Sequence, residues 1–218
     1  MPPAAVKALF RKMLRWPLDR AFPAVDVLRV LLTHPDGGAA VAEEAGAGFV
    51  RAQTERVSAA RLVPALRPVV LLTARALGNA LKTEPVRLLM LAGAGGVLDC
   101  ASELVHYDSA PVKTAAAVLL HNLAHALLTQ TRRGGVPPNP DLVDRLVGLV
   151  LEGLVAVPPD AASAEVLLLA LGTAASFGPR FAATARDFDL PAAVAAAGRA
   201  FPPLAELVAD VLLVLQTV

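Results

Sequence analysis

The sequence predicts an all-α protein built as a solenoid, in which similar helical units stack side by side. The first observation is a recurrence: an apolar helical run with one small polar residue, at 71–82, returns altered at 117–125 and at 167–175. The second is the composition, which is 56% hydrophobic but only 4% aromatic, so the core must be aliphatic. Third, no segment alternates polar and apolar residues with a period of two, and we therefore expect no β-sheet.

The polar residues set into the recurring helices give the spacing of the repeat. They are Asn79, Asn122 and Thr173, and a fainter earlier copy places Arg29 where Asn79 sits, with offsets of 50, 43 and 51 residues. Periods in the forties are typical of armadillo and HEAT arrays, whose units are bundles of two or three helices. Such units cannot bury an apolar face alone and must stack. We predict an armadillo/HEAT-like right-handed α-solenoid of about five to six short repeats.

Proline and glycine set the expected helix boundaries in the first half of the chain. The first helix, 4–15, ends at Trp16 because a residue before proline is pushed out of the α region. Pro23 can occupy the first turn of the second helix, 22–33, which we expect to break at the turn cluster 34–38. Gly93 to Gly96 are read as a helix cap and turn. The other helices are expected at 39–47, 49–60, 69–82, 86–92 and 97–106.

In the second half, Pro111 marks the entry of a helix over 112–129. The stretch 132–140, rich in glycine and proline, is the clearest loop, and Asp141 places a carboxylate at the positive end of the helix that follows. Pro158, Pro159 and Asp160 lead into the helix of the third copy. The helices expected after the loop are 141–156, 162–176, 180–187, 191–199 and 203–216.

The bulk properties limit the function classes. A solenoid of 218 residues can form a single domain, 1–218 with a core of about 8–217. No apolar stretch reaches the length of about 18 residues that a membrane span needs, and the start lacks the layout of a signal peptide. One cysteine excludes an intrachain disulfide, and a net charge of +1 gives no support to nucleic-acid binding. We expect a cytoplasmic or nuclear location.

The polar residues at equivalent positions predict a groove that binds an extended peptide, because asparagine offers a donor and an acceptor to a peptide backbone. Residues at i−4 and i+3 share a helix face, so cations should flank Asn79, and a histidine should lie beside Asn122. The lining helices carry a net charge of +2 against +1 for the whole chain, which favours an acidic or C-terminal peptide. The predicted groove consists of Arg29, Arg75, Asn79, Lys82, Asn122 and His125.

Structural roles compete with this interpretation at three positions. Asn79 can satisfy a neighbouring loop, Arg29 can pair with Asp26 three residues earlier, and His125 can serve only as an interhelix residue. The recurrence in phase favours the groove.

Catalytic and metal-binding interpretations have weaker support. His121 and His125 are spaced like two metal ligands on a helix, but a third ligand is not evident. Cys100 near His106 and Asp108 suggests thiol chemistry, whereas a free cysteine on an apolar helix is usually a core residue. Gly93 to Gly96 lack the Gly-Lys-Ser/Thr of a phosphate loop. We expect no enzyme activity, no metal, no cofactor and no small-molecule substrate.

Several of these segments carry a family resemblance. Trp16-Pro17, the segment 22–29 with Phe22-Pro23, Asp26 and Arg29, His34-Pro35, and the helices of Asn79 and Asn122 resemble the PUL domain. This is the armadillo-like C-terminal domain of the phospholipase-activating protein (PLAA) family, and the similarity runs over nearly the whole chain.

The resemblance implies a non-enzymatic adaptor. In that family a basic groove receives the acidic C-terminal tail of the valosin-containing-protein AAA+ ATPase, in ubiquitin-dependent protein turnover. By position, Arg29 matches an arginine associated with tail binding. A second family arginine would fall at about Val166, where this chain has none. The alternative is a structural α-solenoid scaffold that binds a folded protein outside the groove. A nuclear-import-type receptor fits poorly, because its groove needs tryptophans and acids.

Overall fold

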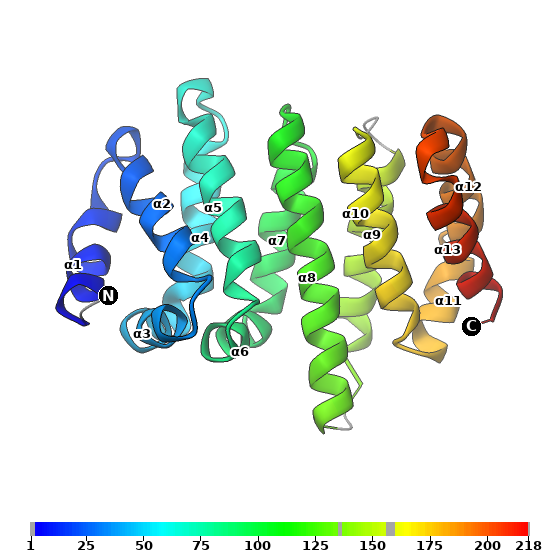
Figure 1. The fold of residues 1–218 in the computed structure, drawn as a ribbon, viewed down its shortest axis with the longest axis horizontal. Coiled ribbons are helices and arrows are strands. Elements are labelled where there is room, and N and C mark those ends of the chain that lie inside the picture. The colour runs from blue at the N-terminus through cyan, green and yellow to red at the C-terminus, as the bar shows by residue number, and fades with distance from the viewer. Residues whose placement is uncertain (1–2, 135–136, 156–159, 218) are drawn as a thin grey trace. The chain divides into compact units, whose positions relative to one another are not determined.

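The computed structural model describes residues 3–134, 137–155 and 160–217, and these ranges contain helices and no strand. The chain forms two compact units, unit 1 (Met1–Tyr107) and unit 2 (Asp108–Val218). Unit 1 runs from blue to green and unit 2 from green to red in Figure 1. The all-α class and the absence of a sheet therefore agree with the sequence over the described residues.

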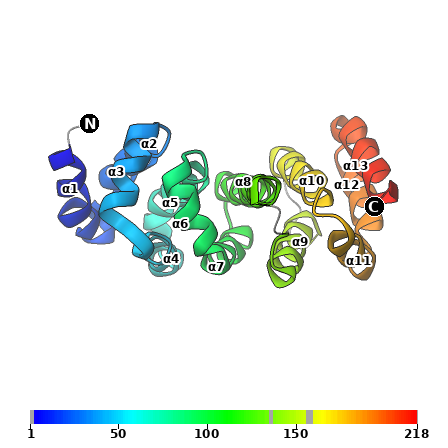
Figure 2. The ribbon, with the colours of Figure 1, turned by 90° about the horizontal axis from the view of Figure 1, so that it is seen from below.

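Unit 1 contains two three-helix repeats, α2–α4 and α5–α7, preceded by α1. Equivalent helices of the two repeats pack together: α5 on α2, α6 on α3, and α7 on α4. Figure 2 shows α2 and α5 in one layer and α4 and α7 in the other. The helices are α1 (Pro3–Arg11), α2 (Phe22–Leu31), α3 (Pro35–Ala45), α4 (Phe49–Ala60), α5 (Arg67–Ala80), α6 (Glu84–Ala92) and α7 (Ala94–Val105), with 3-10 turns η1 (Met13–Arg15), η2 (Leu18–Arg20), η3 (Gly46–Gly48) and η4 (Pro64–Leu66).

Polar contacts hold the second layer of unit 1 in register. The Ser58 hydroxyl of α4 lies 2.9 and 3.0 Å from the two carboxylate oxygens of Glu103 on α7 and donates to this group. Arg61 forms an ion pair with the same carboxylate at 3.2 Å. Since a single carboxylate on α7 receives Ser58 of α4 and Arg61, the residue that follows α4, these contacts fix the position of the end of α4 on α7.

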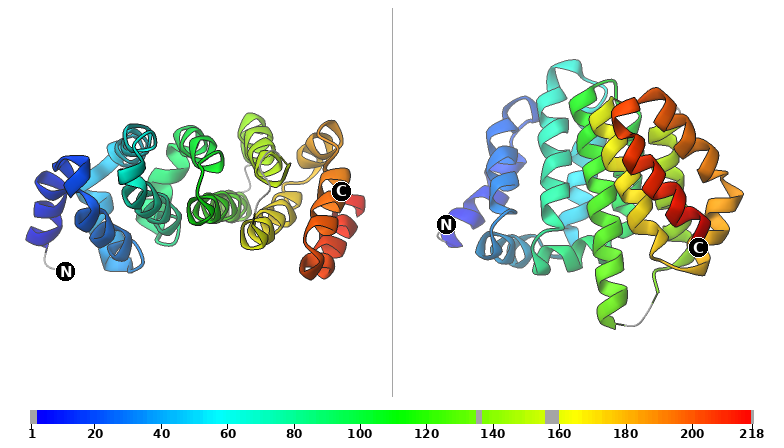
Figure 3. Two further views of the ribbon diagram at one scale, coloured as in Figure 1. Left: turned by 90° about the horizontal axis from the view of Figure 1, so that it is seen from above. Right: turned by 45° about the vertical axis from the view of Figure 1, so that its right-hand side comes forward.

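Unit 2 also forms two layers. Helix α10 packs between α8 and α13, and α9 contacts α11 and α12 on the other side (Figure 3). The helices are α8 (Ala110–Gly134), α9 (Pro140–Val155), α10 (Ala161–Ala175), α11 (Pro179–Asp187), α12 (Leu190–Ala200) and α13 (Ala205–Thr217), with η5 at Pro202–Leu204. The core is aliphatic except for a few aromatic residues such as the fully buried Phe181.

Hydroxyl groups join the helices of unit 2. Thr114 on α8 and the buried Ser163 on α10 lie 3.1 Å apart through their hydroxyl oxygens. The backbone N–H of Ser163 also donates to the side chain of Asp160 at 2.8 Å, which caps α10 as its N-terminal residue. On the other side, the Thr184 hydroxyl of α11 donates to Asp144 of α9 at 2.6 Å. The start of α10 is therefore fixed both locally and to α8.

Two glycine-rich segments that the sequence analysis assigned to turns begin helices instead. In the predicted break 34–38, α3 starts at Pro35, which is tolerated in a first turn. Gly37 and Gly38 are buried at the start of this helix. No larger residue fits there, because a Cβ on Gly37 would overlap the backbone of Leu31 and one on Gly38 would overlap the side chain of Thr83. The glycines permit close helix packing and do not end the helix.

The predicted turn at 93–96 is likewise short, because α7 already begins at Ala94. A Cβ on Gly93 would lie 3.0 Å from a Val50 methyl carbon, so this glycine allows α4 to approach. Helix α8 extends to Gly134 and so takes the start of the predicted loop 132–140. The parts of the predicted loops at 135–136 and 158–159 lie outside the described residues.

Close packing at Gly37 predicts that Gly37→Ala destabilises the protein by about 2 kcal/mol, because the added methyl meets backbone that cannot rotate away. Gly148 in the middle of α9 is the control, since a Cβ there would have no heavy atom within 4 Å. Gly148→Ala should raise stability by about 0.5–1 kcal/mol. Urea denaturation measures both, and a neutral Gly37→Ala would contradict the packing.

Candidate functional site

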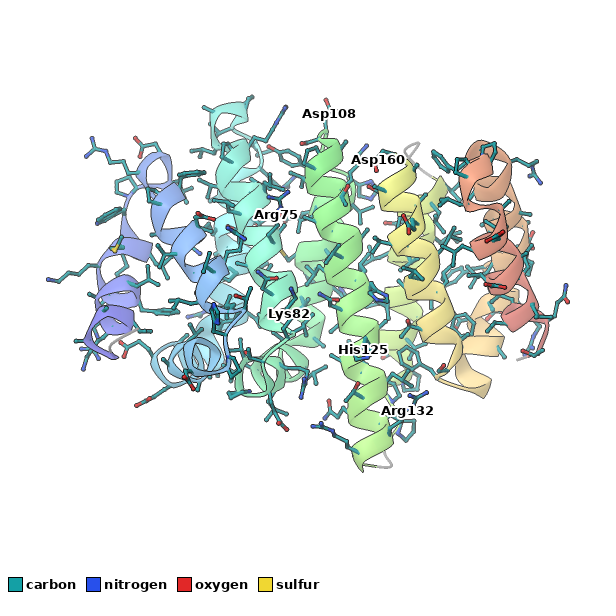
Figure 4. All side chains as sticks on the ribbon, viewed as in Figure 1. Arg75, Lys82, Asp108, His125, Arg132 and Asp160 are labelled. Atoms are coloured by element: carbon teal, nitrogen blue, oxygen red, sulfur yellow. The ribbon has the colours of Figure 1, made fainter. Side chains whose placement is uncertain are left out.

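The exposed face of α5 carries the first group of predicted groove residues. Arg75 and Lys82 are exposed and Asn79 is half-buried, whereas the residues between them, such as Leu77 and Ala80, are buried. Their spacing of four and three residues places them on one side of the helix, as Figure 4 shows for Arg75 and Lys82. The face predicted from helical periodicity is therefore present in unit 1.

Asn79 has a structural contact. Its side-chain amide donates to the backbone carbonyl oxygen of Arg29 at 3.0 Å. That carbonyl belongs to the last turn of α2, so the bond ties the end of α2 to α5. The side-chain N–H group that we expected to donate a hydrogen bond to a bound peptide therefore already donates one within the protein.

Arg29 is also engaged. Its Nε and Nη2 atoms lie 2.8 and 2.7 Å from the same carboxylate oxygen of Asp26, one turn earlier on α2. Because both side chains are only partly exposed, the pair neutralises most of the positive charge that Arg29 would offer a ligand. Among the described residues no carboxylate lies within 4.0 Å of Arg75 or Lys82, so no ion pair compensates the charge of these two side chains.

Exposed apolar side chains also lie on α2, the helix that packs against α5, and helical spacing of polar residues did not predict them. Phe22, Val27 and Val30 are 48, 39 and 45% exposed, which is unusual for such residues on a packed helix. Our sequence criterion, a single polar residue within an apolar helix, does not select exposed apolar side chains. Their exposure gives unit 1 a mixed surface, cationic on α5 and apolar on α2.

In unit 2 the predicted residues lie on the exposed face of α8. Asn122 is half-buried and His125 is exposed, and the same face continues to the exposed Val118 and Arg132 at heptad spacing. Figure 4 shows His125 and Arg132 along this helix. The structure thus brings Asn122 and His125 together on one face, as the spacing predicts.

His125 opens onto a cavity of about 380 Å³. Its walls come from α8, α10 and α13, and Thr173, the polar residue of the third sequence copy, contributes to it from α10. The predicted recurrence therefore places Thr173 and His125 at one cavity. Helix α13 carries no copy of the recurring pattern, so its contribution was not foreseen. The cavity residues are His125, Leu128, Leu168, Leu169, Gly172, Thr173, Ser176, Leu207, Asp210, Val211 and Val214.

Val166 lies half-buried on α10, at the position where the family resemblance would place an arginine. Its exposed neighbours on the helix are Glu165 and Leu169. The exposed face of α10 in unit 2 is therefore acidic at one end and apolar in the middle, and it does not supply a cation to a ligand.

His121 lies half-buried on α8 in unit 2. Burial lowers the pKa of His121, the neighbouring His125 lowers it further, and the backbone carbonyl of Leu169 opposes these effects. Its Nδ1 atom is buried, with no hydrogen-bond partner in the described part of the chain. Three or more His, Cys, Asp or Glu side chains able to hold a metal ion do not meet anywhere in the described ranges.

Cys100 is fully buried on α7. Burial raises the pKa of the Cys100 thiol to about 12, with help from the carboxylates of Glu103 and Asp99 and against a hydrogen bond from Thr54. Since the thiolate is the nucleophile, the thiol is unreactive near neutral pH. Cys100 is a core residue of unit 1.

Among the described residues no single helix is both long and apolar enough to cross a bilayer. Helices α6 and α7 reach the length and composition of a span only when they are joined across a bend of 85°.

These features define an all-α repeat protein whose exposed helix faces carry both polar and apolar side chains. Residues 3–212 match the family model of the PUL domain, so the chain belongs to the PUL domain family. This family is armadillo-like, which confirms the predicted solenoid class, and its members act as protein-interaction domains and not as a known class of enzymes.

A further comparison bears on the fold alone. A crystal structure of an engineered protein matches with a TM-score of 0.52 and 17% sequence identity, over 98% of this chain and 97% of the other. At this identity the match supports the helical architecture. No curated protein matches the sequence.

The lowered pKa of His121 predicts a pH-dependent stability. The unfolded chain, with a histidine pKa of about 6.5, binds the proton more readily than the folded protein, so acidification between about pH 7.5 and 5 favours unfolding. His121→Gln should remove the part of the acid-induced loss of stability that protonation of His121 causes. Thermal unfolding followed by circular dichroism at several pH values tests it, and equal slopes for the two proteins would contradict the assignment.

The bond between Asn79 and Arg29 predicts that Asn79→Ala lowers the free energy of unfolding by about 1 kcal/mol. Chemical denaturation measures this loss. Asn79→Asp is the companion variant: it keeps the size but replaces the amide donor with an acceptor that faces a carbonyl oxygen. A loss from alanine together with no loss from aspartate would contradict the hydrogen bond.

Proposed function

We propose that this PUL domain is an adaptor that binds the acidic C-terminal tail of a valosin-containing-protein-type AAA+ ATPase in ubiquitin-dependent protein turnover. Membership of a protein-interaction family supports the adaptor class. The observation that carries the finer proposal is the pair of cations on α5: Arg75 and Lys82 share an exposed face and face no carboxylate within the described residues. A carboxylate-rich peptide is the ligand that such a face attracts.

Each unit contributes a different chemistry to the proposal. In unit 1, Arg75 and Lys82 attract the acidic part of the peptide, and Phe22, Val27 and Val30 of α2 offer apolar contact. In unit 2, the cavity beside His125 offers apolar walls of leucine and valine, suited to one hydrophobic side chain. In unit 1, Asn79 supports the α5 surface by donating to the backbone carbonyl oxygen of Arg29 on α2. In unit 2, Asn122 lies on the same face of α8 as His125.

The family match extends over both units, so we propose that residues 1–218 act as one PUL domain. A partner of this kind places the protein in the cytoplasm or the nucleus. No catalytic residue, metal or cofactor is part of the proposal.

The alternative is a structural scaffold that binds another folded protein. Two exposed residues favour it: Leu213 on α13 is 61% exposed and Leu62, after α4, is 75% exposed. Large apolar side chains in such positions mark contact surfaces when they belong to a wider patch. Under this alternative, substitution of Leu213 would weaken partner binding and the α5 cations would be irrelevant.

Isothermal titration calorimetry with a synthetic peptide of the ATPase C-terminus tests the proposal. The double substitution Arg75→Glu/Lys82→Glu should weaken binding about tenfold or more, because charge-assisted contacts are replaced by repulsion. The control Arg51→Glu/Lys7→Glu makes the same change in net charge at exposed positions outside α2 and α5 and should have an effect of about twofold or less.

Two outcomes would contradict the proposal. If the wild-type protein does not bind the peptide, the ATPase tail is not the ligand. If both double variants weaken binding equally, the attraction is a property of the net charge and the α5 surface has no special part in it.

A further inference from the structure

Unit 1 contains a second cavity, which shares no residue with the predicted groove. It holds about 630 Å³, is open to solvent on one side, and is lined by residues of α1, η1, α3, η3 and α4. Cavities that bind small ligands or single side chains typically measure about 300–1,000 Å³, so this one can accept a bulky side chain together with a neighbouring polar group.

The lining of this cavity is positively charged. It includes three arginines, Arg11, Arg15 and Arg56, and one acid, Glu44. Arg11 is paired with Glu44 through a contact of 2.8 Å between Nε and Oε1. The charges of Arg15 and Arg56 remain, because among the described residues neither guanidinium has a carboxylate within 4.0 Å.

Arg56 is held in place by neutral acceptors. Its guanidinium donates to the side-chain oxygen of the buried Gln53 and, at 3.1 Å, to the backbone oxygen of Leu14. These bonds orient the group toward the lining without cancelling its charge. Burial lowers the pKa of Arg56, which shows that the surroundings disfavour the cation, although at neutral pH the group stays protonated.

The remaining walls are apolar. Phe49 is buried at 1% exposure, Phe10 and Leu14 are half-buried, and Ala52 is exposed at the rim. Ala52 and Arg56 are one turn apart on α4, so a small residue stands beside the cationic one. An apolar group that enters past Ala52 would reach Phe49 and bring an adjacent carboxylate to Arg56 and Arg15.

We propose that this cavity is a second binding site, for a peptide segment in which a carboxylate side chain stands next to a bulky apolar side chain. The two excess arginines select the carboxylate, since guanidinium groups bind carboxylates through paired hydrogen bonds. The aromatic walls select the apolar side chain. A protein segment is the occupant because the chain belongs to a protein-interaction family.

The probe is a fluorescein-labelled, amide-terminated peptide of sequence Gly-Ser-Asp-Phe-Leu-Glu-Ser-Gly, and binding is followed by fluorescence anisotropy. A matched peptide with Asn and Gln in place of Asp and Glu keeps the apolar side chains and removes the charge. A third arm uses 4-phenylbutyrate as competitor, to separate a peptide site from a site for free aromatic acids.

Three variants address the cavity. Arg15→Gln removes an exposed charge and leaves the core untouched. Ala52→Phe fills the cavity and leaves every arginine in place. Arg56→Gln removes the inner charge, with its fold checked by circular dichroism because this side chain also contacts Leu14. The control is Arg51→Gln, on the same helix and exposed but outside the lining.

The proposal expects the acidic peptide to bind at least about tenfold more tightly than the neutral one, and Arg15→Gln and Ala52→Phe each to weaken it about fivefold or more. Arg51→Gln should leave it unchanged, and Arg75→Glu/Lys82→Glu should change it by about twofold or less, as expected for the altered net charge alone. Loss of binding in the α5 double variant, or retention in Ala52→Phe, would overturn the second site whatever the ATPase tail does. Tighter binding of 4-phenylbutyrate than of the peptide would overturn the peptide as occupant.

Discussion

Each helix of this chain carries an aliphatic face that it cannot bury by itself, so it must pack that face against a neighbouring helix. Large aromatic side chains contribute little to this burial, because only 4% of the residues are aromatic. In unit 1 this requirement pairs α2 with α5 and α4 with α7, and in unit 2 it places α10 between α8 and α13. Each helix in these layers is buried on the sides that meet its neighbours. What remains exposed is a narrow stripe, and on α5 that stripe contains Arg75, Asn79 and Lys82. The proposed binding surface is the face that stacking leaves uncovered.

Stacking also decides which polar residues are available to a ligand. Asn79 stands close enough to α2 to bond the carbonyl of Arg29, and so it takes part in the packing that creates the surface. Arg29 meets Asp26 on its own helix. In the described structure Arg75 and Lys82, on the same α5 stripe, form no such ion pair, and their charges stay available to a ligand.

Helical periodicity was sufficient to predict the class of the fold and the shared face of Arg75, Asn79 and Lys82, since both follow from local spacing. It could not predict where a glycine-rich segment becomes helical. Gly37 and Gly38 resemble a turn in sequence, and only the approach of Leu31 and Thr83 explains why residues without side chains are required at the start of α3. The contribution of Asp210 and Val211 to the cavity beside His125 depends on the packing of α13 on α10, which no recurring pattern encodes.

The contrast between Arg29 and Arg56 shows most clearly which contacts helix geometry can predict from the sequence and which it cannot. Arg29 finds its acid three residues away, a pairing that helix geometry alone suggests. Arg56 is bound by Leu14, 42 residues away, and by Gln53, and both acceptors are neutral. A neutral acceptor satisfies the N–H groups but leaves the positive field, and that field acts over a lower effective dielectric constant in a partly buried cavity than on an exposed helix face. An acidic group would therefore gain more from Arg56 than from an exposed cation such as Arg75, although nothing in the sequence around Arg56 distinguishes it from the other arginines of the chain.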